Sequence, residues 1–196
     1  MAASTDIYTG IAAPSEGLYK DKGSRFIAYA YPVTDPSQVK PIVDSLKKEH
    51  HAARHHCYAY RIGYDGALWR ANDDGEPSGT AGRPILAAID SACLSDTLIV
   101  VVRYFGGILL GVPGLVRAYR EAAGDAIANA RKEEKTAART FEIRFGYSDM
   151  NDVQARVKST PGAVVLSQNF DLECTMSVSV PLGGAASFEA KISKYL

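Results

Sequence analysis

Residues 72–86 have the sequence NDDGEPSGTAGRPIL, and residues 103–119 have the sequence RYFGGILLGVPGLVRAY. Each stretch follows a predicted strand and leads into a predicted helix. Glycine lets the backbone turn freely and lets another chain or a ligand come close, and a helix N-terminus favours an anion. These stretches, called here the first and second glycine loops, therefore predict two strand–loop–helix units in one domain.

The residues before the first glycine loop predict a strand, a helix and a hairpin. The segment FIAYAY at 26–31 predicts a strand that ends at Pro32. A helix is expected to start at residues 35–38 (DPSQ) and to end near Arg54, because apolar residues recur between them at helical spacing. Two short strands, 57–62 and 67–70, flank a turn whose Asp-Gly pair favours a hairpin. Residues 1–24 show no pattern and are expected to form a mobile N-terminus.

The segments around the second glycine loop predict the rest of the first domain. Pro84 suits the first turn of a helix that ends near Ala92, and the apolar run at 97–102 predicts a central strand. A further helix is expected from Leu115 to about Arg131. Its buried stripe would comprise Leu115, Val116, Tyr119, Ala122, Ala123, Ala126 and Ile127. The charged run RKEEK at 131–135 is interpreted as a helix end and a linker.

Residues 136–196 predict a second domain. Apolar residues alternate over 141–147, a short helix is expected at 152–159, and a strand at 164–168 is followed by alternation from Phe170 to Val180. That alternation predicts one strand with one wet face. The residues expected to face the helices are Phe170, Leu172, Cys174, Met176, Val178 and Val180. Those expected on the open face are Asp171, Glu173, Thr175, Ser177 and Ser179.

A final helix at 185–195 would complete the order β-α-β-β-α. This is most of a ferredoxin-like unit, without its last strand. An unpaired edge strand invites pairing with another chain, so we expect a homodimer or a disordered edge there.

The composition is that of an ordinary globular protein and argues against a polycation. The 196 residues contain 22 Lys and Arg against 22 Asp and Glu, balanced in both halves, which argues against bulk duplex binding. Cys57, Cys93 and Cys174 are widely spaced, as is typical of free thiols in a reducing compartment. We recognise no signal peptide and no apolar run of membrane-spanning length, and we expect a cytoplasmic protein.

Several motifs together resemble the YigZ/IMPACT family. They are DGEPSGTAG at 74–82, RYFGG at 103–107 and GLVRAY at 114–119, and HHCYAYR at 55–61 is similar to the family's segment before the first loop. The resemblance covers roughly residues 18–131, and the second domain is similar to the small C-terminal domain of the bacterial members by layout. Two features depart from the family pattern. Val112-Pro113 stands where small polar or glycine residues are more common, and the last strand is absent.

The resemblance implies an α+β protein of two domains after a flexible N-terminus at 1–17. Residues 18–135 would share the fold of the second domain of small-subunit ribosomal protein five and of domain IV of elongation factor G. The ferredoxin-like residues 136–196 would look like the last domain of elongation factor G.

The resemblance also implies a function. Eukaryotic relatives are linked to control of translation initiation under amino-acid starvation, by competing for an activator of the responsible kinase. Bacterial relatives are regarded as nucleic-acid or ribosome-associated proteins. We therefore expect a non-enzymatic translation regulator that binds RNA, the ribosome or a ribosome-linked protein, with no membrane partner.

Arginines beside the glycine loops are the candidate phosphate-binding or nucleic-acid-binding residues. The planar guanidinium binds phosphate with two hydrogen bonds, and an exposed Tyr104 could stack on a base. Phe105 and Tyr119 are instead expected in the core. The candidate set is Arg83, Arg103, Tyr104, Gly106, Gly107, Arg117 and Arg120.

The acidic residues of the first glycine loop have an alternative role. They could pair with the arginines and hold the loops in place, which we favour over a metal cluster or an acid/base pair. The loop-structuring set is Asp73, Asp74, Glu76, Gly79, Gly82, Gly111 and Gly114.

Other chemistry is weakly indicated. His50, His51, His55 and His56 lie close to Cys57, and His51 and His55 have a spacing that can bind zinc, but a closed site needs four convergent ligands. Neither glycine loop carries the lysine of a nucleotide-binding motif. We expect no metal, no cofactor and no catalytic residue. Two alternatives stay open: a nucleotide- or phosphate-ligand enzyme that uses the same glycine loops, and a pure protein-binding module.

Overall fold

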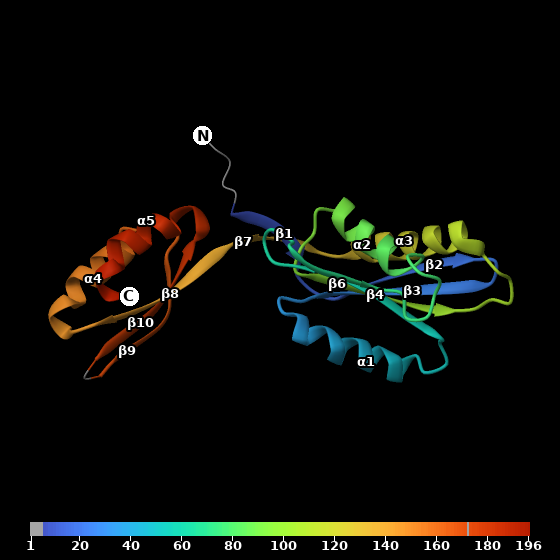
Figure 1. Cartoon of the computed structure of the whole chain (residues 1–196), viewed down its shortest axis with the longest axis horizontal. Coiled ribbons are helices and arrows are strands. Elements are labelled where there is room, and N and C mark those ends of the chain that lie inside the picture. Colours follow the sequence, from blue (N-terminus) through green and yellow to red (C-terminus); the bar gives the residue numbers. More distant parts are fainter. Residues whose placement is uncertain (1–5, 172) are drawn as a thin grey trace. The chain divides into compact units, whose positions relative to one another are not determined.

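The computed structural model describes residues 6–171 and 173–196, which form two compact units (Figure 1). The larger unit is Tyr8–Lys135, and the smaller unit is built mainly from Thr136–Leu196. Both units combine helices with sheets. The mixed α/β architecture of two domains is thus the one that the sequence predicts.

The larger unit is built on a five-stranded antiparallel sheet in the order β2-β3-β6-β4-β5. Helix α1 lies on one face of this sheet, and α2 and α3 lie on the other (Figure 1). The elements, in chain order, are β1 (Ile7–Ile11), β2 (Ser15–Asp21), β3 (Ser24–Pro32), η1 (Pro36–Gln38), α1 (Val39–Glu49), β4 (His55–Ile62), β5 (Leu68–Asn72), α2 (Gly82–Ser91), β6 (Thr97–Tyr104), α3 (Gly111–Asn129) and β7 (Lys132–Thr136).

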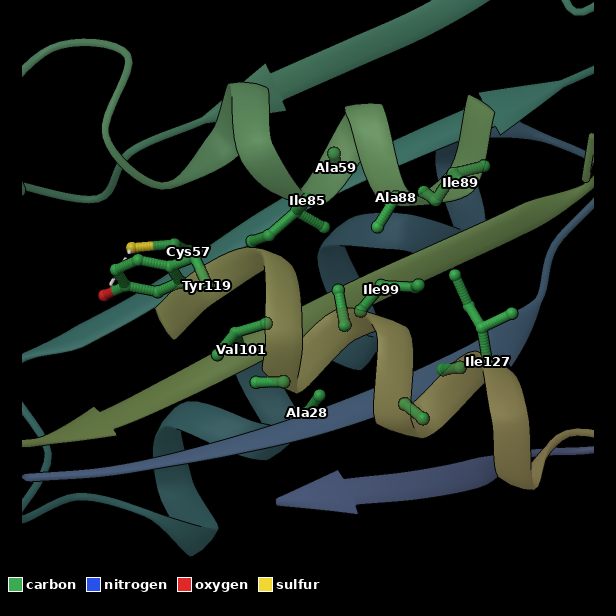
Figure 2. Close-up of a cluster of buried hydrophobic side chains, with 14 of the residues drawn as sticks. Ala28, Cys57, Ala59, Ile85, Ala88, Ile89, Ile99, Val101, Tyr119 and Ile127 are labelled. Carbon is green, nitrogen blue, oxygen red and sulfur yellow. Dashed lines mark hydrogen bonds between the residues drawn. The ribbon is translucent and has the colours of Figure 1, made fainter. Parts of the chain in front are cut away.

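The position of β6 at the centre of the sheet explains why its sequence is apolar. Leu98, Val100 and Val102 pack in the cluster beneath α1. Ile99 and Val101 pack on the opposite face, against α2 and α3 (Figure 2). Because successive side chains of a strand point to opposite faces, a strand covered on both sides must be apolar throughout.

Residues 6–24 contain regular structure, contrary to the expectation of a mobile N-terminus at 1–24. β1 and β2 form there. The apolar alternation that signals a strand is missing because the innermost position of β2 is Gly17. A Cβ on Gly17 would lie 2.2 Å from the backbone nitrogen of Ala126 in α3, so only glycine fits.

Other element boundaries differ from the sequence prediction. The charged run at 131–135 lies largely in β7, which pairs with β1 and is mostly exposed, so it carries no apolar period. α3 begins at Gly111 and includes Val112-Pro113, and its stripe buries Ala118 while Val116 is half-buried. α1 begins after a capping box at Asp35 and ends at Glu49, before Arg54.

The smaller unit has the β-α-β-β-α order that the sequence predicts. Its antiparallel sheet has the order β8-β10-β9. The elements are β8 (Ala138–Phe145), η2 (Tyr147–Asp149), α4 (Met150–Lys158), β9 (Val164–Phe170), β10 (Cys174–Pro181), α5 (Leu182–Ile192) and η3 (Ser193–Tyr195).

The long alternating run in this unit is two strands rather than one. The chain reverses between Phe170 and Cys174, which are register partners in the β9–β10 hairpin. A period of two continues unchanged through such a tight turn, so the pattern alone does not reveal it.

Most of the apolar face predicted for that run is buried in the structure. The apolar residues of β10 are buried and Phe170 packs partly against them, whereas Leu172 lies outside the described residues. Ser177 is buried rather than open. The homodimer stays a prediction.

Candidate functional site

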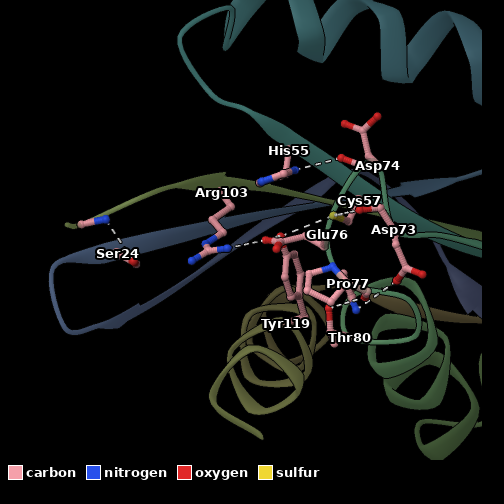
Figure 3. A network of polar contacts seen from close by, with 12 residues as sticks. Ser24, His55, Cys57, Asp73, Asp74, Glu76, Pro77, Thr80, Arg103 and Tyr119 are labelled. Carbon is pink, nitrogen blue, oxygen red and sulfur yellow. Dashed lines mark hydrogen bonds and ion pairs between the residues drawn. The ribbon is translucent and has the colours of Figure 1, made fainter. Parts of the chain in front are cut away.

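A buried polar network joins the two glycine loops (Figure 3). Arg103 Nη1 donates to Glu76 Oε1 at 2.6 Å, and the Tyr119 hydroxyl donates to the same oxygen at 2.7 Å. The Cys57 thiol lies 3.3 Å from the Tyr119 oxygen. The side chains of Arg103 and Glu76 are only 8% and 3% exposed, so the two charges neutralise each other in the interior. This network fastens the first loop to β6 and α3.

The network contains no activated nucleophile. Burial, followed by the neighbouring Cys57 and Glu76, raises the pKa of Tyr119 above its usual range. Burial also raises the pKa of the Cys57 thiol, against the opposing effect of its hydrogen bond to Tyr119. A reactive cysteine needs a lowered pKa, so Cys57 is built to pack and to donate a hydrogen bond.

Asp73 occupies the helix N-terminus that the first glycine loop would offer to a phosphate. Its carboxylate accepts from the backbone nitrogens of Gly79 and Gly82, both at 2.8 Å, and of Ala81 at 3.1 Å. Burial raises the pKa of Asp73, but these three donors and the charge of Arg83 together lower it. The anion position at this end of α2 is therefore filled by the chain itself.

The neighbouring Asp74 also holds the first loop. Its carboxylate accepts from the His56 backbone nitrogen at 2.7 Å and pairs with Lys47 Nζ at 2.9 Å. Burial raises the pKa of Asp74, but the hydrogen bonds from Lys47 and His56 lower it. All three acidic residues of the loop thus have structural partners.

Some glycines of the two loops lie in close contact with neighbouring residues, and the others face open space. A Cβ on Gly82 would lie 2.5 Å from the Asn72 nitrogen, and one on Gly106 would lie 2.0 Å from the Gly23 carbonyl carbon. A Cβ on Gly114 would meet Leu110 at 2.9 Å. The remaining glycines of the two sets, Gly79, Gly107 and Gly111, have positive φ and no neighbour closer than 3.9 Å to an added Cβ.

The second glycine loop exposes a group of apolar side chains, called here the apolar tip. Its members and their exposed fractions are Phe105 (54%), Ile108 (55%), Leu109 (82%) and Val112 (55%). The prediction that Phe105 lies in the core is wrong, because the chain leaves the sheet directly after β6. The apolar run Ile108-Leu-Leu110 beside two glycines is a sequence signal for this tip.

The arginines of the candidate set differ in burial and in their partners. Arg103 is buried against Glu76, whereas Arg117 is exposed and pairs with Asp21 at 3.1 Å. Arg120 is exposed on α3, and Arg83 is exposed at the start of α2. A surface that reads phosphates through all four arginines is therefore not what the loops form.

Tyr104 also lies away from the other candidates. It follows Arg103 in β6 and so points to the opposite face, where its hydroxyl contacts His50 Nδ1 at 2.8 Å. The guanidinium of Arg25 lies over its ring at 5.0 Å. Tyr104 is half-buried rather than an exposed stacking platform.

The histidines are also dispersed. His50 lies between the hydroxyls of Tyr29 and Tyr104, and His55 contacts the Asp74 carbonyl. His56 is buried, and this burial lowers its pKa. Among residues 6–171 and 173–196, no three His, Cys, Asp or Glu residues are placed to hold a metal ion. None of the helices in these ranges is long and apolar enough to cross a membrane.

Comparison with known proteins identifies the family. The Impact N-terminal domain family matches residues 22–127. The chain is 33% identical over 186 residues to "IMPACT family member YigZ" of Escherichia coli (strain K12), which covers 94% of this chain and 91% of that protein. It is 38% identical over 96 residues to "Protein IMPACT" of Oryctolagus cuniculus, covering 46% of this chain and 30% of that protein. The crystal structure of "an hypothetical protein" has a TM-score of 0.74 and 31% identity, over 96% of this chain and 92% of that chain. The chain belongs to the IMPACT family.

Proposed function

We propose that this protein is a non-enzymatic, translation-associated regulator that binds a ribosome-linked protein through the apolar tip. The translation role rests on membership of the IMPACT family and on the role that the resemblance implies for its eukaryotic members. The mode of binding rests on one observation. Four large apolar side chains are exposed on a loop whose base is held by a buried ion pair.

The chemistry of the loops favours a protein over an RNA as the partner. Adjacent exposed apolar side chains on a soluble protein are typical of a protein interface. Recognition of a phosphate backbone needs free cationic groups and open backbone donors. Arg103 is used by Glu76, and the donors at the start of α2 are used by Asp73.

An RNA partner is the second candidate, because Arg117 and Arg120 are both exposed on α3. Of these, Arg117 is already paired with Asp21. RNA binding through them would be strongly salt-dependent, whereas apolar contacts would survive added salt.

Co-sedimentation with purified ribosomes tests the proposal. The full chain is compared at low and high salt with two variants, Phe105→Ser/Leu109→Ser and Arg117→Ala/Arg120→Ala. Leu166→Ser is the matched control, since Leu166 is 59% exposed in the other unit. We expect the tip variant to lose binding at both salt concentrations, and the arginine variant and the control to retain it.

Two results would overturn this proposal. Binding that is lost with the arginine variant or with salt, but not with the tip variant, would identify RNA as the partner. An absence of ribosome binding by the unaltered chain would remove the ribosome as the site of action.

A further inference from the structure

The two edges of the five-stranded sheet differ in how their outward backbone groups are hydrogen-bonded. At the β2 edge, the Leu18 nitrogen donates to Asp125 and the Glu16 carbonyl accepts from Asn129, both at 2.8 Å. Side chains of α3 thus satisfy two of the outward backbone groups of β2. At the other edge, β5 pairs with β4 alone. Among the hydrogen bonds of residues 6–171 and 173–196, none outside that ladder uses a backbone group of β5.

The open edge strand also exposes its side chains on both faces. Leu68 and Trp69 are 47% and 50% exposed, and Arg70 is exposed as well. An exposed edge of this kind pairs readily with an added strand. Its length of five residues and the charge of Arg70 limit indiscriminate pairing but do not cover its backbone.

A hollow flanks β5 on each side of the sheet. The hollow on the α1 side is floored by Tyr58 and Tyr60 of β4. Its charged border consists of the Lys40–Asp44 and Lys47–Asp74 pairs and of Arg70. The hollow on the α2 side is lined by Trp69, Arg83, Leu86 and the Arg61–Asp90 pair. A strand added to β5 would place its alternate side chains in these two hollows, because successive residues point to opposite faces.

Each hollow contains an arginine that is free to meet an acid. Lys47 is paired with Asp74, and Arg61 is paired with Asp90. Arg70 and Arg83 make no ion pair or hydrogen bond with any of residues 6–171 or 173–196, although the charge of Arg83 influences Asp73. The two guanidinium groups therefore offer one carboxylate site on each face of β5.

We propose that β5 is the docking site for an extended acidic segment of a partner protein, which adds to the sheet as a further strand. Backbone hydrogen bonds to β5 supply the pairing, and acidic side chains on opposite faces of the segment meet Arg70 and Arg83. The site is separate from the apolar tip and does not rest on the function proposed above.

The spacing of the acidic residues is a sharp requirement. Two carboxylates one or three positions apart point to opposite faces, and two carboxylates two positions apart point to the same face. The partner segment should therefore carry its acidic residues at odd spacing.

Short valine- and threonine-rich peptides test the site on the intact chain. One peptide carries adjacent glutamates, a second has the glutamates two positions apart, a third has lysines in place of the glutamates, and a fourth repeats the first with alternate backbone N-methylation. Trp69 is the chain's single tryptophan and lies on β5, so its fluorescence reports binding at this edge. We expect the first peptide to change the Trp69 emission and to bind at least about tenfold more tightly than the other three.

Charge reversal supplies the complementary test. Arg70→Glu and Arg83→Glu should each weaken binding of the first peptide about tenfold, and the double variant should prefer the lysine peptide. Arg131→Glu is the matched control, because Arg131 is exposed and directly precedes β7, which belongs to a different sheet from β5. The Phe105→Ser/Leu109→Ser variant should bind the peptide normally, which separates this site from the apolar tip.

Three results would overturn the docking site. They are equal binding of the glutamate and lysine peptides, tight binding that leaves the Trp69 emission unchanged, and an absence of binding by all four peptides. Because these comparisons use the unaltered chain, they hold even if a charge-reversed variant folds poorly.

Discussion

The two glycine loops are both rich in glycine and both lead into a helix, but the first is held by its own acidic residues and the second exposes apolar side chains. In the first loop, Asp73 accepts three backbone hydrogen bonds at the start of α2, and Glu76 is buried against Arg103 and Tyr119. In the second loop, Gly106 packs on the β2–β3 turn, but the following residues leave an exposed apolar tip. A glycine-rich stretch before a helix thus predicts close backbone contact, and it predicts a ligand only where the chain supplies no carboxylate of its own.

The largest effect should follow from breaking the ion pair that joins the loops. Glu76→Ala leaves Arg103 buried without a counter-charge, and we expect a loss of about 3–5 kcal/mol in the free energy of unfolding. Chemical denaturation measures this loss, with Glu121→Ala on the exposed surface of α3 as the control.

A double-mutant cycle with Arg103→Met tests the same pair. The combined variant should lose less stability than the sum of the two single variants, because each charge alone is the costly state. Additive losses would mean that Glu76 and Arg103 act independently.

The second-largest loss of stability should follow from disturbing the close contact that Gly106 of the second loop makes with the β2–β3 turn. Gly106→Ala would place a methyl group within 2.2 Å of the Ser24 backbone nitrogen, so β2, β3 or the loop must shift. Forced overpacking costs about 1–3 kcal/mol. Gly124→Ala is the matched control, because its Cβ would meet nothing within 4 Å on α3, and helix propensity predicts a gain of up to about 1 kcal/mol. Equal stability of the two variants would contradict the close contact.

The sequence predicted the fold more completely than the site. The continuous apolar run of β6, the helical periodicity of α3 and the helix-start signal at Asp35 predicted the central elements, because their burial is reflected in the local sequence. The sequence did not predict β2 and β7. β2 packs through Gly17 rather than through an apolar side chain, and β7 is exposed on both faces.

The site was less predictable because it depends on which groups meet in space. Arg103 and Tyr104 are neighbours in the sequence but lie on opposite faces of β6. The sequence favoured a structural role for the loop carboxylates, but it did not show that Glu76 pairs with Arg103 whereas Asp74 pairs with Lys47. The open edge at β5 could not be recognised from the sequence, since it depends on the strand order of the whole sheet.

The third effect is smaller and depends on pH. Asp73→Ala removes the acceptor of three backbone donors at the start of α2, a loss of about 0.5–2 kcal/mol as for other helix caps. The pKa of Asp73 is lowered in the folded chain from its ordinary 3.8, so its contribution is complete above that pH and is lost as the pH falls through the folded value.

The difference in stability between the unaltered chain and Asp73→Ala should therefore shrink as the pH falls below 3.8, the ordinary pKa of this carboxyl. Denaturation curves at a series of pH values measure it, with the exposed Asp171→Ala as the control. A difference that stays constant down to strongly acidic pH would contradict the capping role of the Asp73 carboxylate.

The smallest effect on stability should come from the apolar tip. Leu109 is 82% exposed, so Leu109→Ala should change the free energy of unfolding by less than about 0.5 kcal/mol. The same substitution at Leu115, which lies on α3 and is 6% exposed in the core, should cost about 2–5 kcal/mol. The two variants differ by six positions along one segment, so thermal or chemical denaturation compares an exposed with a buried leucine directly. A large loss at Leu109 would mean that the tip is packed in solution, and the second loop would then be as closed as the first.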